Sequence, residues 1–398
     1  MEDLPVRFAE RISRTKASEI REILKVTQNP EIISFAGGLP APELFPIDGV
    51  KRADAAVLDE SGMKALQYTT TEGYDPLRAW IAERINRRNG TSMDKDNIMI
   101  THGSQQALDL AGKVFLDEGD VVLCESPTYL AAITAFRSYG CRFVDIPTDN
   151  DGMIISELRK AMDGNDNIKL IYLVPNFQNP TGRTWSLERR RELAEMSALR
   201  SIAVIEDDPY GEIRFEGDDI RSVQSFDAAG NVLSTGTFSK ILCPGLRIGW
   251  IAGNKEIIRK FVLVKQGADL QCNTFAQMSI SKFLEQNDID EHIRVIRETY
   301  RKRRDLAVMT MRAEFPDGVT FTEPEGGLFA WIELPGYMNA RDVLMRCLEL
   351  KVAFVPGGSF FANGGHENTL RINFSNMPEE RIVKGLKIMA DVIREFMR

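Results

Sequence analysis

A short polar segment in the second half of the chain carries residue types that could bind a phosphate group. Thr237, Ser239, Lys240 and Arg247 lie between two apolar runs, in the sequence TFSKILCPGLR. Hydroxyl groups can donate to a phosphate oxygen, and a guanidinium can pair with a phosphate through two hydrogen bonds. The amine of Lys240 could be one more phosphate ligand, or it could form a Schiff base with an aldehyde cofactor. The spacing of this segment alone favours the phosphate ligand.

Acidic residues follow the apolar segment 202–205, in the sequence EDDPY that ends at Tyr210. If segment 202–205 is a parallel strand, these carboxylates lie at the edge of the sheet where α/β proteins bind ligands. An aspartate next to a pyridine nitrogen would keep that nitrogen protonated and make the ring an electron acceptor. We assign this role to Asp207. The alternative is that the acids are solvated or cap the following turn, as aspartates often do.

Three further turns carry side chains that could bind the same ligand. In the sequence THGSQQ, the start of a helix would present N–H groups to an anion near Ser104 and Gln105, although a serine there is commonly only a helix cap. Asn179, in the sequence NFQNPTG, could donate to a phenolic oxygen or could belong to a simple turn. Tyr129 could stack on an aromatic ring, although a tyrosine at the rim of the core is the commoner case. Each of these signals is weak by itself.

The elements that would position these residues form the pattern of a mainly parallel α/β sheet with helices on both faces. Short, continuously apolar runs alternate with helical patterns, and such runs are typical of strands buried on both faces. The runs lie at 98–101, 121–123, 142–144, 170–173 and 202–205. The run 247–251 follows the run 231–234 too closely for a crossover helix, so we expect one strand to be antiparallel.

The length of 398 residues predicts more than one domain. Residues 1–50 contain an amphipathic helix near 18–28 and a breaker-rich turn at 37–40, which indicates an arm laid over another surface. Residues 51–290 would form the large cofactor-binding domain. Residues 291–398 would form a small α/β or α+β domain, because helices and strands alternate there. Its helices are expected at about 288–313, at 340–350 and from 378.

Composition and charge exclude several classes of protein. The chain has 43% hydrophobic and 27% charged residues, as ordinary globular proteins do. Its formal net charge of -8 argues against a nucleic-acid partner. The five cysteines and three histidines lack the spacing of a disulfide framework or a metal site, so we expect reduced thiols and no metal. Without a signal-peptide pattern or an apolar run of about 20 residues, we expect a cytoplasmic protein with no membrane partner.

Taken together, these segments resemble the fold-type I pyridoxal-phosphate enzymes, specifically the class I aminotransferases of the group that contains 2-aminoadipate, kynurenine and aromatic aminotransferases. The resemblance covers essentially the whole chain. Its most specific segments, in the family's order, are SFAGGLPAPELFP at 34–46, QY at 67–68 with EG at 72–73, GSQQ at 103–106, NPTG at 179–182, DDPY at 207–210, KILCPGLR at 240–247 and LRIN at 370–373. The resemblance implies an aspartate-aminotransferase-like fold with a mainly parallel seven-stranded sheet, and pyridoxal 5′-phosphate as the cofactor.

The resemblance also assigns roles to single residues. Lys240 matches the lysine that holds the cofactor as a Schiff base and moves the substrate's α-proton, and Asp207 matches the partner of the pyridine nitrogen. Asn179 and Tyr210 match residues that bind the ring oxygen of the cofactor, and Tyr129 matches the aromatic residue that stacks on its ring. The implied phosphate ligands are Ser104, Gln105, Thr237, Ser239 and Arg247, together with Tyr68 reaching over from the neighbouring subunit. An obligate homodimer with shared active sites is therefore implied.

For the substrates, the resemblance implies an amino acid and a 2-oxo acid that react in turn by a ping-pong mechanism, with glutamate and 2-oxoglutarate as the usual pair. Arg371 matches the arginine that binds the α-carboxylate through two hydrogen bonds, with Gly38 and Asn179 beside the substrate. Ser18 and Arg21 lie one turn apart on the expected N-terminal helix, and in aminoadipate-type members a serine and an arginine there meet a distal carboxylate. We therefore expect 2-aminoadipate, aromatic or branched-chain donors. Arg21 could instead be an ordinary surface residue.

Other functions remain open. A β-lyase, or another pyridoxal-phosphate enzyme acting on amino acids, would share the fold and would release ammonia and pyruvate from a cysteine conjugate. The aminotransferase-like sensing domain of a transcription regulator would follow a winged-helix module, whereas this chain begins almost directly with the arm. A nicotinamide dehydrogenase is excluded because no G-x-G-x-x-G follows the first strand. We also predict cis peptide bonds before Pro127 and Pro180, as in related enzymes.

Overall fold

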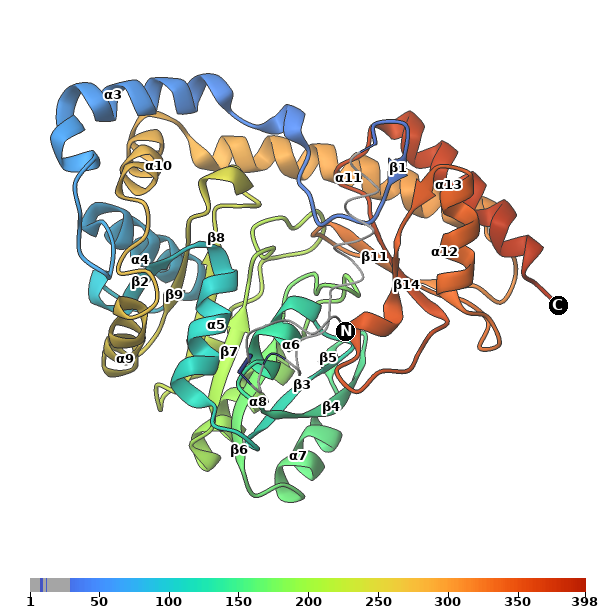
Figure 1. Cartoon of the computed structure of the whole chain (residues 1–398), viewed down its shortest axis with the longest axis horizontal. Coiled ribbons are helices and arrows are strands. Elements are labelled where there is room, and N and C mark those ends of the chain that lie inside the picture. The colour runs from blue at the N-terminus through green and yellow to red at the C-terminus, as the bar shows by residue number, and fades with distance from the viewer. Residues whose placement is uncertain (1–7, 10–11, 13–28) are drawn as a thin grey trace.

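An eight-stranded sheet forms the centre of the protein (Figure 1), in a computed structural model that describes residues 8, 9, 12 and 29–398. The strands follow the order β2-β9-β8-β7-β6-β3-β4-β5. Their bounds are β2 Ile98–Thr101, β3 Val121–Ser126, β4 Arg142–Asp149, β5 Gly152–Met153, β6 Ile168–Leu173, β7 Ala203–Asp207, β8 Val232–Thr237 and β9 Gly249–Ala252. The sheet is parallel except for β9, which is antiparallel to both its neighbours, and β5, which is antiparallel to β4.

The observed sheet confirms the predicted mainly parallel architecture. The antiparallel strand expected at 247–251 is β9. The eighth strand, which the resemblance did not imply, is β5 at the edge of the sheet. A strand of two residues is too short to show a hydrophobic period, so the sequence contained no signal for it.

The helices of the described residues surround this sheet and a smaller one. They are α3 Ile47–Ala65, α4 Asp75–Asn89, α5 Gly103–Phe115, α6 Leu130–Arg137, α7 Ile155–Asp163, α8 Leu187–Arg200, α9 Lys255–Gln266, α10 Thr274–Gln286, α11 Ile289–Glu314, α12 Ala340–Glu349 and α13 Glu379–Glu395. Short 3-10 turns lie at Pro42–Leu44, Lys95–Asn97, Val223–Phe226, Pro244–Leu246 and Gly357–Phe360. The helices predicted in the last third of the chain are α11, α12 and α13.

The large sheet separates two apolar cores, which explains why its strands are apolar on both faces. Along β3, Val121 and Leu123 belong to one core, whereas Val122 and Cys124 belong to the other. Successive side chains of a strand point to opposite faces, so each face must be covered. Helices α7 and α8 close the first core, and α5, α6 and α9 close the second. The prediction of helices on both faces is confirmed.

A second sheet lies in the C-terminal third, next to α12 and α13 (Figure 1). Its four strands follow the order β10-β11-β14-β13 and are antiparallel. Their bounds are β10 Thr320–Phe321, β11 Phe329–Glu333, β13 Val355–Pro356 and β14 Thr369–Asn373. The long helix α11 passes from the side of α3 and α10 to the side of α13 and joins the two parts (Figure 1). The antiparallel pairing makes this part α+β, one of the two forms expected.

The N-terminal segment packs against the C-terminal part of the chain. Strand β1 (Ile33–Ser34) pairs in parallel with β12 (Val352–Ala353). The N–H of Asn373 also donates to the carbonyl of Phe35 at 2.9 Å. Residues 33–35 of the expected arm are therefore anchored to the smaller sheet's side of the molecule. The domain boundaries near 50 and 290 stay predictions. None of the described helices is long and apolar enough to cross a membrane.

Candidate active site

A cavity of about 1030 Å³ lies where the parallel strands of the large sheet end. The candidate residues that line it come from the turns after β2, β3, β6, β7 and β8, from the N-terminal segment and from β14. They are Gly38, Ser104, Gln105, Tyr129, Asn179, Asp207, Tyr210, Thr237, Ser239, Lys240, Arg247 and Arg371. The carboxyl edge of a parallel sheet is where α/β proteins bind ligands. The fold therefore brings together residues that are up to 333 positions apart, from Gly38 to Arg371.

The Lys240 amine lies in this cavity and donates to the carbonyl oxygen of Gly38 at 2.7 Å. Burial, together with the positive charges of Arg371 and Arg247, lowers the pKa of the Lys240 amine to about 8. A lysine with this pKa has a fraction of neutral, nucleophilic amine near neutral pH that an ordinary lysine lacks, whereas a phosphate ligand needs only the charged ammonium. The environment of Lys240 therefore favours the Schiff-base interpretation over the phosphate-ligand interpretation.

Hydroxyl groups and a guanidinium gather at one end of the cavity. The hydroxyl of Thr237 donates to the Ser239 hydroxyl at 2.9 Å and accepts the Ser239 backbone N–H at 3.1 Å. Arg247 Nη2 donates to the carbonyl of His102 at 3.3 Å. No carboxylate among the described residues pairs with Arg247, so its charge is available to an anionic ligand.

The first turn of α5 contributes backbone N–H groups to the same end. Ser104 lies in this turn, where unpaired N–H groups and the helix dipole attract an anion. Gly103 opens the helix at φ +67°, and a Cβ there would lie 2.6 Å from Nη2 of Arg247. Only glycine lets the turn and the guanidinium approach this closely. Gln105 is exposed and its amide donates to the carbonyl of Ala131 at 3.2 Å.

A buried carboxylate also lines the cavity. Asp207 accepts hydrogen bonds from the hydroxyl of Thr235 at 2.6 Å and from the hydroxyl of Tyr172 at 2.9 Å. Burial raises the pKa of the Asp207 carboxyl to about 6, although these two hydrogen bonds act in the other direction. No cation among the described residues forms an ion pair with Asp207. A protonated ring nitrogen would supply the missing positive charge.

The Arg371 guanidinium is buried near the N-terminal segment. It donates to Oδ1 of Asn179 at 2.7 Å and to the carbonyl of Ala36 at 2.5 Å, and it lies 4.2 Å above the ring of Phe329. Burial lowers the pKa of Arg371 to about 10. Its Nε has no hydrogen-bond partner, and it forms no ion pair with a carboxylate of the described residues. A substrate carboxylate would satisfy both the charge and the open donor.

Tyr129 and Tyr210 line the cavity from two different strand ends. Tyr129 directly precedes α6, and the Tyr210 ring meets Phe329 edge-on with a centroid distance of 5.8 Å. Burial raises the pKa of the Tyr210 hydroxyl, while a hydrogen bond with the Asn179 side chain lowers it, and the net change is upward. Tyr210 is therefore a neutral hydrogen-bonding group next to Asn179. The peptide bonds before Pro127 and Pro180, which belong to the turns carrying Tyr129 and Asn179, are both cis, as predicted.

Three candidate residues are not placed in this cavity. Tyr68 lies outside it and is 77% exposed, which is unusual for a tyrosine. Ser18 and Arg21 lie outside the described residues.

The sequence interpretation missed the residues that hold Asp207. Thr235 lies directly opposite Asp207 in the register of β7 and β8, and Tyr172 lies on the neighbouring strand β6. The polar second half of strand β8, whose sequence is VLSTGT, was the one available signal for Thr235. It could be interpreted only once the strand order was known, because register is a tertiary property.

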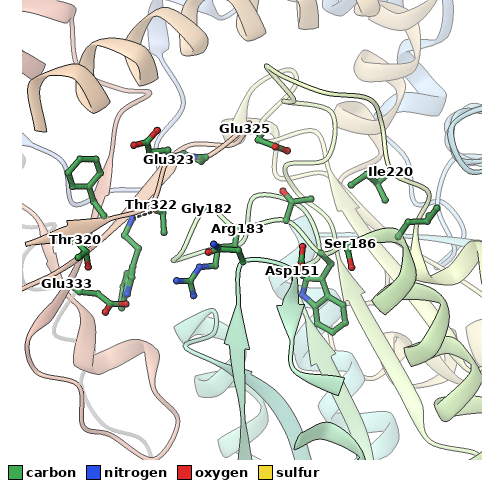
Figure 2. A pocket seen from close by; sticks show the side chains of 17 residues that line it. Asp151, Gly182, Arg183, Ser186, Ile220, Thr320, Thr322, Glu323, Glu325 and Glu333 are labelled. Atoms are coloured by element: carbon green, nitrogen blue, oxygen red, sulfur yellow. Dashed lines mark hydrogen bonds between the residues drawn. The ribbon is translucent and has the colours of Figure 1, made fainter. Parts of the chain in front are cut away.

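A second cavity, of about 860 Å³, lies between the turns at 150–151 and 182–187 and the strands β10 and β11 (Figure 2). Arg183 is the only basic residue among the described residues that line it. Its acidic lining residues are Asp151, Glu323, Glu325 and Glu333 (Figure 2). This excess of carboxylates does not suit a phosphate or an amino-acid carboxylate, so the candidate site is the cavity around Lys240.

A family model for aminotransferase classes I and II matches residues 41–388. The chain belongs to the class I and II aminotransferases. This aminotransferase is 43% identical to aromatic-amino-acid aminotransferase 1 of Thermococcus litoralis, over 98% of this chain and 95% of that protein. It is also 43% identical to 2-aminoadipate transaminase of Thermus thermophilus, over 97% and 96% of the two chains. Among solved structures, Pyrococcus horikoshii kynurenine aminotransferase has a TM-score of 0.94 at 41% identity, over 98% of each chain.

This aminotransferase uses pyridoxal 5′-phosphate, and the cavity fits that cofactor. The hydroxyls and Arg247 at one end match a phosphate dianion. The buried Asp207, which also lines the cavity, has no cation as a partner among the described residues and matches a protonated pyridine. Lys240, with its lowered pKa, matches the amine that condenses with the aldehyde.

Proposed function

We propose that this aminotransferase accepts 2-aminoadipate, aromatic and branched-chain amino acids, with glutamate and 2-oxoglutarate as the usual pair. The proposal rests on one observation, which is that the cavity combines the buried, unpaired Arg371 with an apolar wall. Arg371 would bind the α-carboxylate that all amino acids share. Ala36 and Leu130 line the cavity and belong to an apolar cluster with Phe360 and Trp331. Such a wall suits an aromatic or aliphatic side chain.

Three residues would divide the work of the reaction. Pyridoxal phosphate supplies an aldehyde that condenses with amines and a ring that accepts electrons. Nζ of Lys240 removes the proton from the substrate Cα and later returns a proton, which its pKa of about 8 permits near neutral pH. Asp207, buried and charged, keeps the ring nitrogen protonated. Arg371 holds the α-carboxylate so that the Cα–H bond points toward Lys240, a positioning effect worth several kcal/mol.

Recognition of a distal carboxylate requires another cation. Among the described residues that line the cavity, the Lys and Arg side chains are Lys240, Arg247 and Arg371, and each already has a role. We therefore assign the distal carboxylate of glutamate or 2-aminoadipate to Arg21, with Ser18 beside it. The name of the Thermus relative, a 2-aminoadipate transaminase, supports an acidic substrate. The names of the aromatic and kynurenine relatives support the apolar ones.

A substrate panel with 2-oxoglutarate as acceptor tests this assignment. Arg21→Ala is expected to raise KM for 2-aminoadipate and glutamate roughly 10- to 150-fold, because a charge-assisted hydrogen bond contributes about 1.5–3 kcal/mol. KM for leucine and phenylalanine should change less than about twofold. Arg14→Ala, in the same segment, is the matched control and should leave all four values unchanged. Equal increases of KM for acidic and apolar substrates would show that Arg21 does not bind the distal carboxylate.

The reaction class is tested separately. Reduction of the holoenzyme with borohydride should leave the cofactor attached to Lys240, as located by peptide mapping. Product analysis should show a 2-oxo acid and a new amino acid in equal amounts. Release of ammonia and pyruvate from a cysteine conjugate without any acceptor would favour the β-lyase.

We further propose a homodimer with shared active sites. Tyr68 is 77% exposed, and Met63 and Leu66 close to it in the chain are 94% and 76% exposed. Large apolar side chains exposed together mark a protein interface. In the dimer, Tyr68 would reach the cofactor phosphate of the neighbouring subunit. All five cysteines are free, which fits the cytoplasmic location that we also propose.

A further inference from the structure

A polar cluster lies behind the first turn of α5, where α9 ends. We define it as the Lys265 cluster, formed by Lys265, Asp269, Gln106 and His102. We propose that this cluster positions the turn 101–106, so that Lys265 and Asp269 increase the affinity for the cofactor phosphate without touching it. Neither Lys265 nor Asp269 lines the cavity, whereas His102 and Gln106 do. The inference rests on the proposed phosphate site around Arg247.

The Lys265 ammonium is the centre of the cluster. Its side chain is fully buried, and Nζ donates to the two carboxylate oxygens of Asp269 at 2.6 and 2.8 Å and to Oε1 of Gln106 at 3.1 Å. An ammonium has three N–H donors, so its hydrogen-bonding capacity is satisfied within the cluster. A buried charge with complete hydrogen bonding holds its partners in one arrangement.

Asp269 and Gln106 connect Lys265 with the turn 101–106 through hydrogen bonds. Oδ2 of Asp269 accepts the side-chain N–H of Gln106 at 2.6 Å and lies 3.2 Å from Nε2 of His102. Oε1 of Gln106 in turn accepts the backbone N–H of His102 at 2.9 Å. Both the side chain and the backbone of His102 are thus held by the cluster.

His102 connects the cluster with the phosphate site. Its carbonyl accepts a hydrogen bond from Arg247 at 3.3 Å, and the next residue, Gly103, leaves no room for a Cβ beside that guanidinium. A shift of His102 would therefore move Arg247 and the N–H groups of α5 together. Because these groups bind a phosphate only when they converge on it, their positions decide the affinity.

A metal ion is the alternative occupant of this region. His102, Asp269 and Cys272 each place one possible ligand atom within 4.8 Å of the others. However, the Lys265 ammonium already neutralises the Asp269 carboxylate, and a second cation there would be repelled. We therefore interpret the cluster as a set of hydrogen bonds around the Lys265 ammonium that holds the turn 101–106 in place.

Cofactor binding to the full-length apoenzyme tests the proposal, because two ligands separate the phosphate from the ring. Lys265→Met is expected to weaken binding of pyridoxal 5′-phosphate at least tenfold. Binding of pyridoxal, which has the ring and the aldehyde but no phosphate, should change less than twofold. Asp269→Asn keeps the shape of the side chain and removes its charge, so it should show the same selectivity. Lys255→Met is the matched control, since Lys255 lies at the other end of α9 and pairs with Asp94.

The outcomes distinguish this inference from the proposed phosphate site. In a folded variant, equal weakening of both ligands, or no weakening of either, overturns the positioning role. If Arg247→Ala removes the preference for the phosphorylated ligand while Lys265→Met and Asp269→Asn keep it, only this inference is wrong. If Arg247→Ala also keeps the preference, the phosphate site itself is wrongly placed and the inference falls with it.

Discussion

The Arg371→Met variant should lose most of its catalytic activity while its free energy of unfolding changes little. Arg371 is 4% exposed and has no carboxylate partner among the described residues. Burial lowers the pKa of Arg371 to about 10, which corresponds to roughly 3 kcal/mol by which burial disfavours the cation. A base whose pKa is lowered by folding destabilises the folded state while the unfolded chain is protonated. This cost is complete below pH 10 and declines as the pH rises above that value.

Methionine removes that cost but leaves two acceptors without a donor. They are Oδ1 of Asn179 and the carbonyl of Ala36, and each unpaired buried acceptor costs about 1–3 kcal/mol. At about 1.5 kcal/mol for each of these neutral acceptors the two effects cancel, so the free energy of unfolding should change by no more than about 1 kcal/mol. The catalytic loss should be much larger. Truncating one partner of a buried charge pair costs about 2–5 kcal/mol, which lowers kcat/KM by roughly 30- to 5000-fold.

Two measurements check this prediction. Chemical denaturation gives the free energy of unfolding, and the half-reaction with glutamate, 2-aminoadipate, phenylalanine and leucine gives kcat/KM. All four amino acids should lose activity by similar factors, because they share the α-carboxylate. Arg84→Met is the control, since it leaves the Glu212 carboxylate, whose side chain is only 12% exposed, without its main partner and should lose about 3–5 kcal/mol of stability. A similar loss in Arg371→Met, or activity losses that differ more than tenfold between substrates, would refute the reasoning.

The remaining predictions concern two titratable groups of the cavity. In the apoenzyme, modification of Lys240 by trinitrobenzenesulfonate should become faster as the pH rises through about 8, because the amine must lose its proton first. Peptide mapping gives the rate at this lysine, and a midpoint near 10.5 would contradict the lowered pKa. Burial raises the pKa of Asp207 to about 6, so cofactor binding should weaken as the pH falls through 6 and the carboxylate is protonated. In Asp207→Asn, cofactor binding should be weaker, and the slope of log Kd against pH should be smaller by about one proton. An unchanged slope would exclude Asp207 as the partner of the ring nitrogen.

The strands and turns of the site could be predicted because their signals are local. Buried parallel strands read as apolar runs, and polar residues that follow such runs fall at the carboxyl edge of the sheet. Asp207 and Lys240 could be located in this way from their own segments. The roles of both residues, however, depended on the resemblance, since each local pattern had a plainer interpretation.

The supporting contacts could not be predicted because they join distant parts of the chain. Lys265 lies 159 positions from Gln106, and in the sequence it is an ordinary lysine on an amphipathic helix. Only packing shows that its side chain is fully buried. The carbonyl of Gly38 that accepts from Lys240 is 202 positions away and belongs to the backbone, which leaves no trace in the residue types.

The pairing of β1 with β12 fixes when this enzyme can become functional during its synthesis. Ile33 and Phe35 are buried in the finished protein, but β12 and Asn373, which hold them, are translated more than three hundred residues later. At roughly 5–20 residues per second, the delay is roughly 15–65 s. Until then the apolar segment around Ile33 and Phe35 has no strand to join. The proposed substrate-carboxylate pocket, which Gly38 and Arg371 both line, is therefore assembled only after the large sheet has been made.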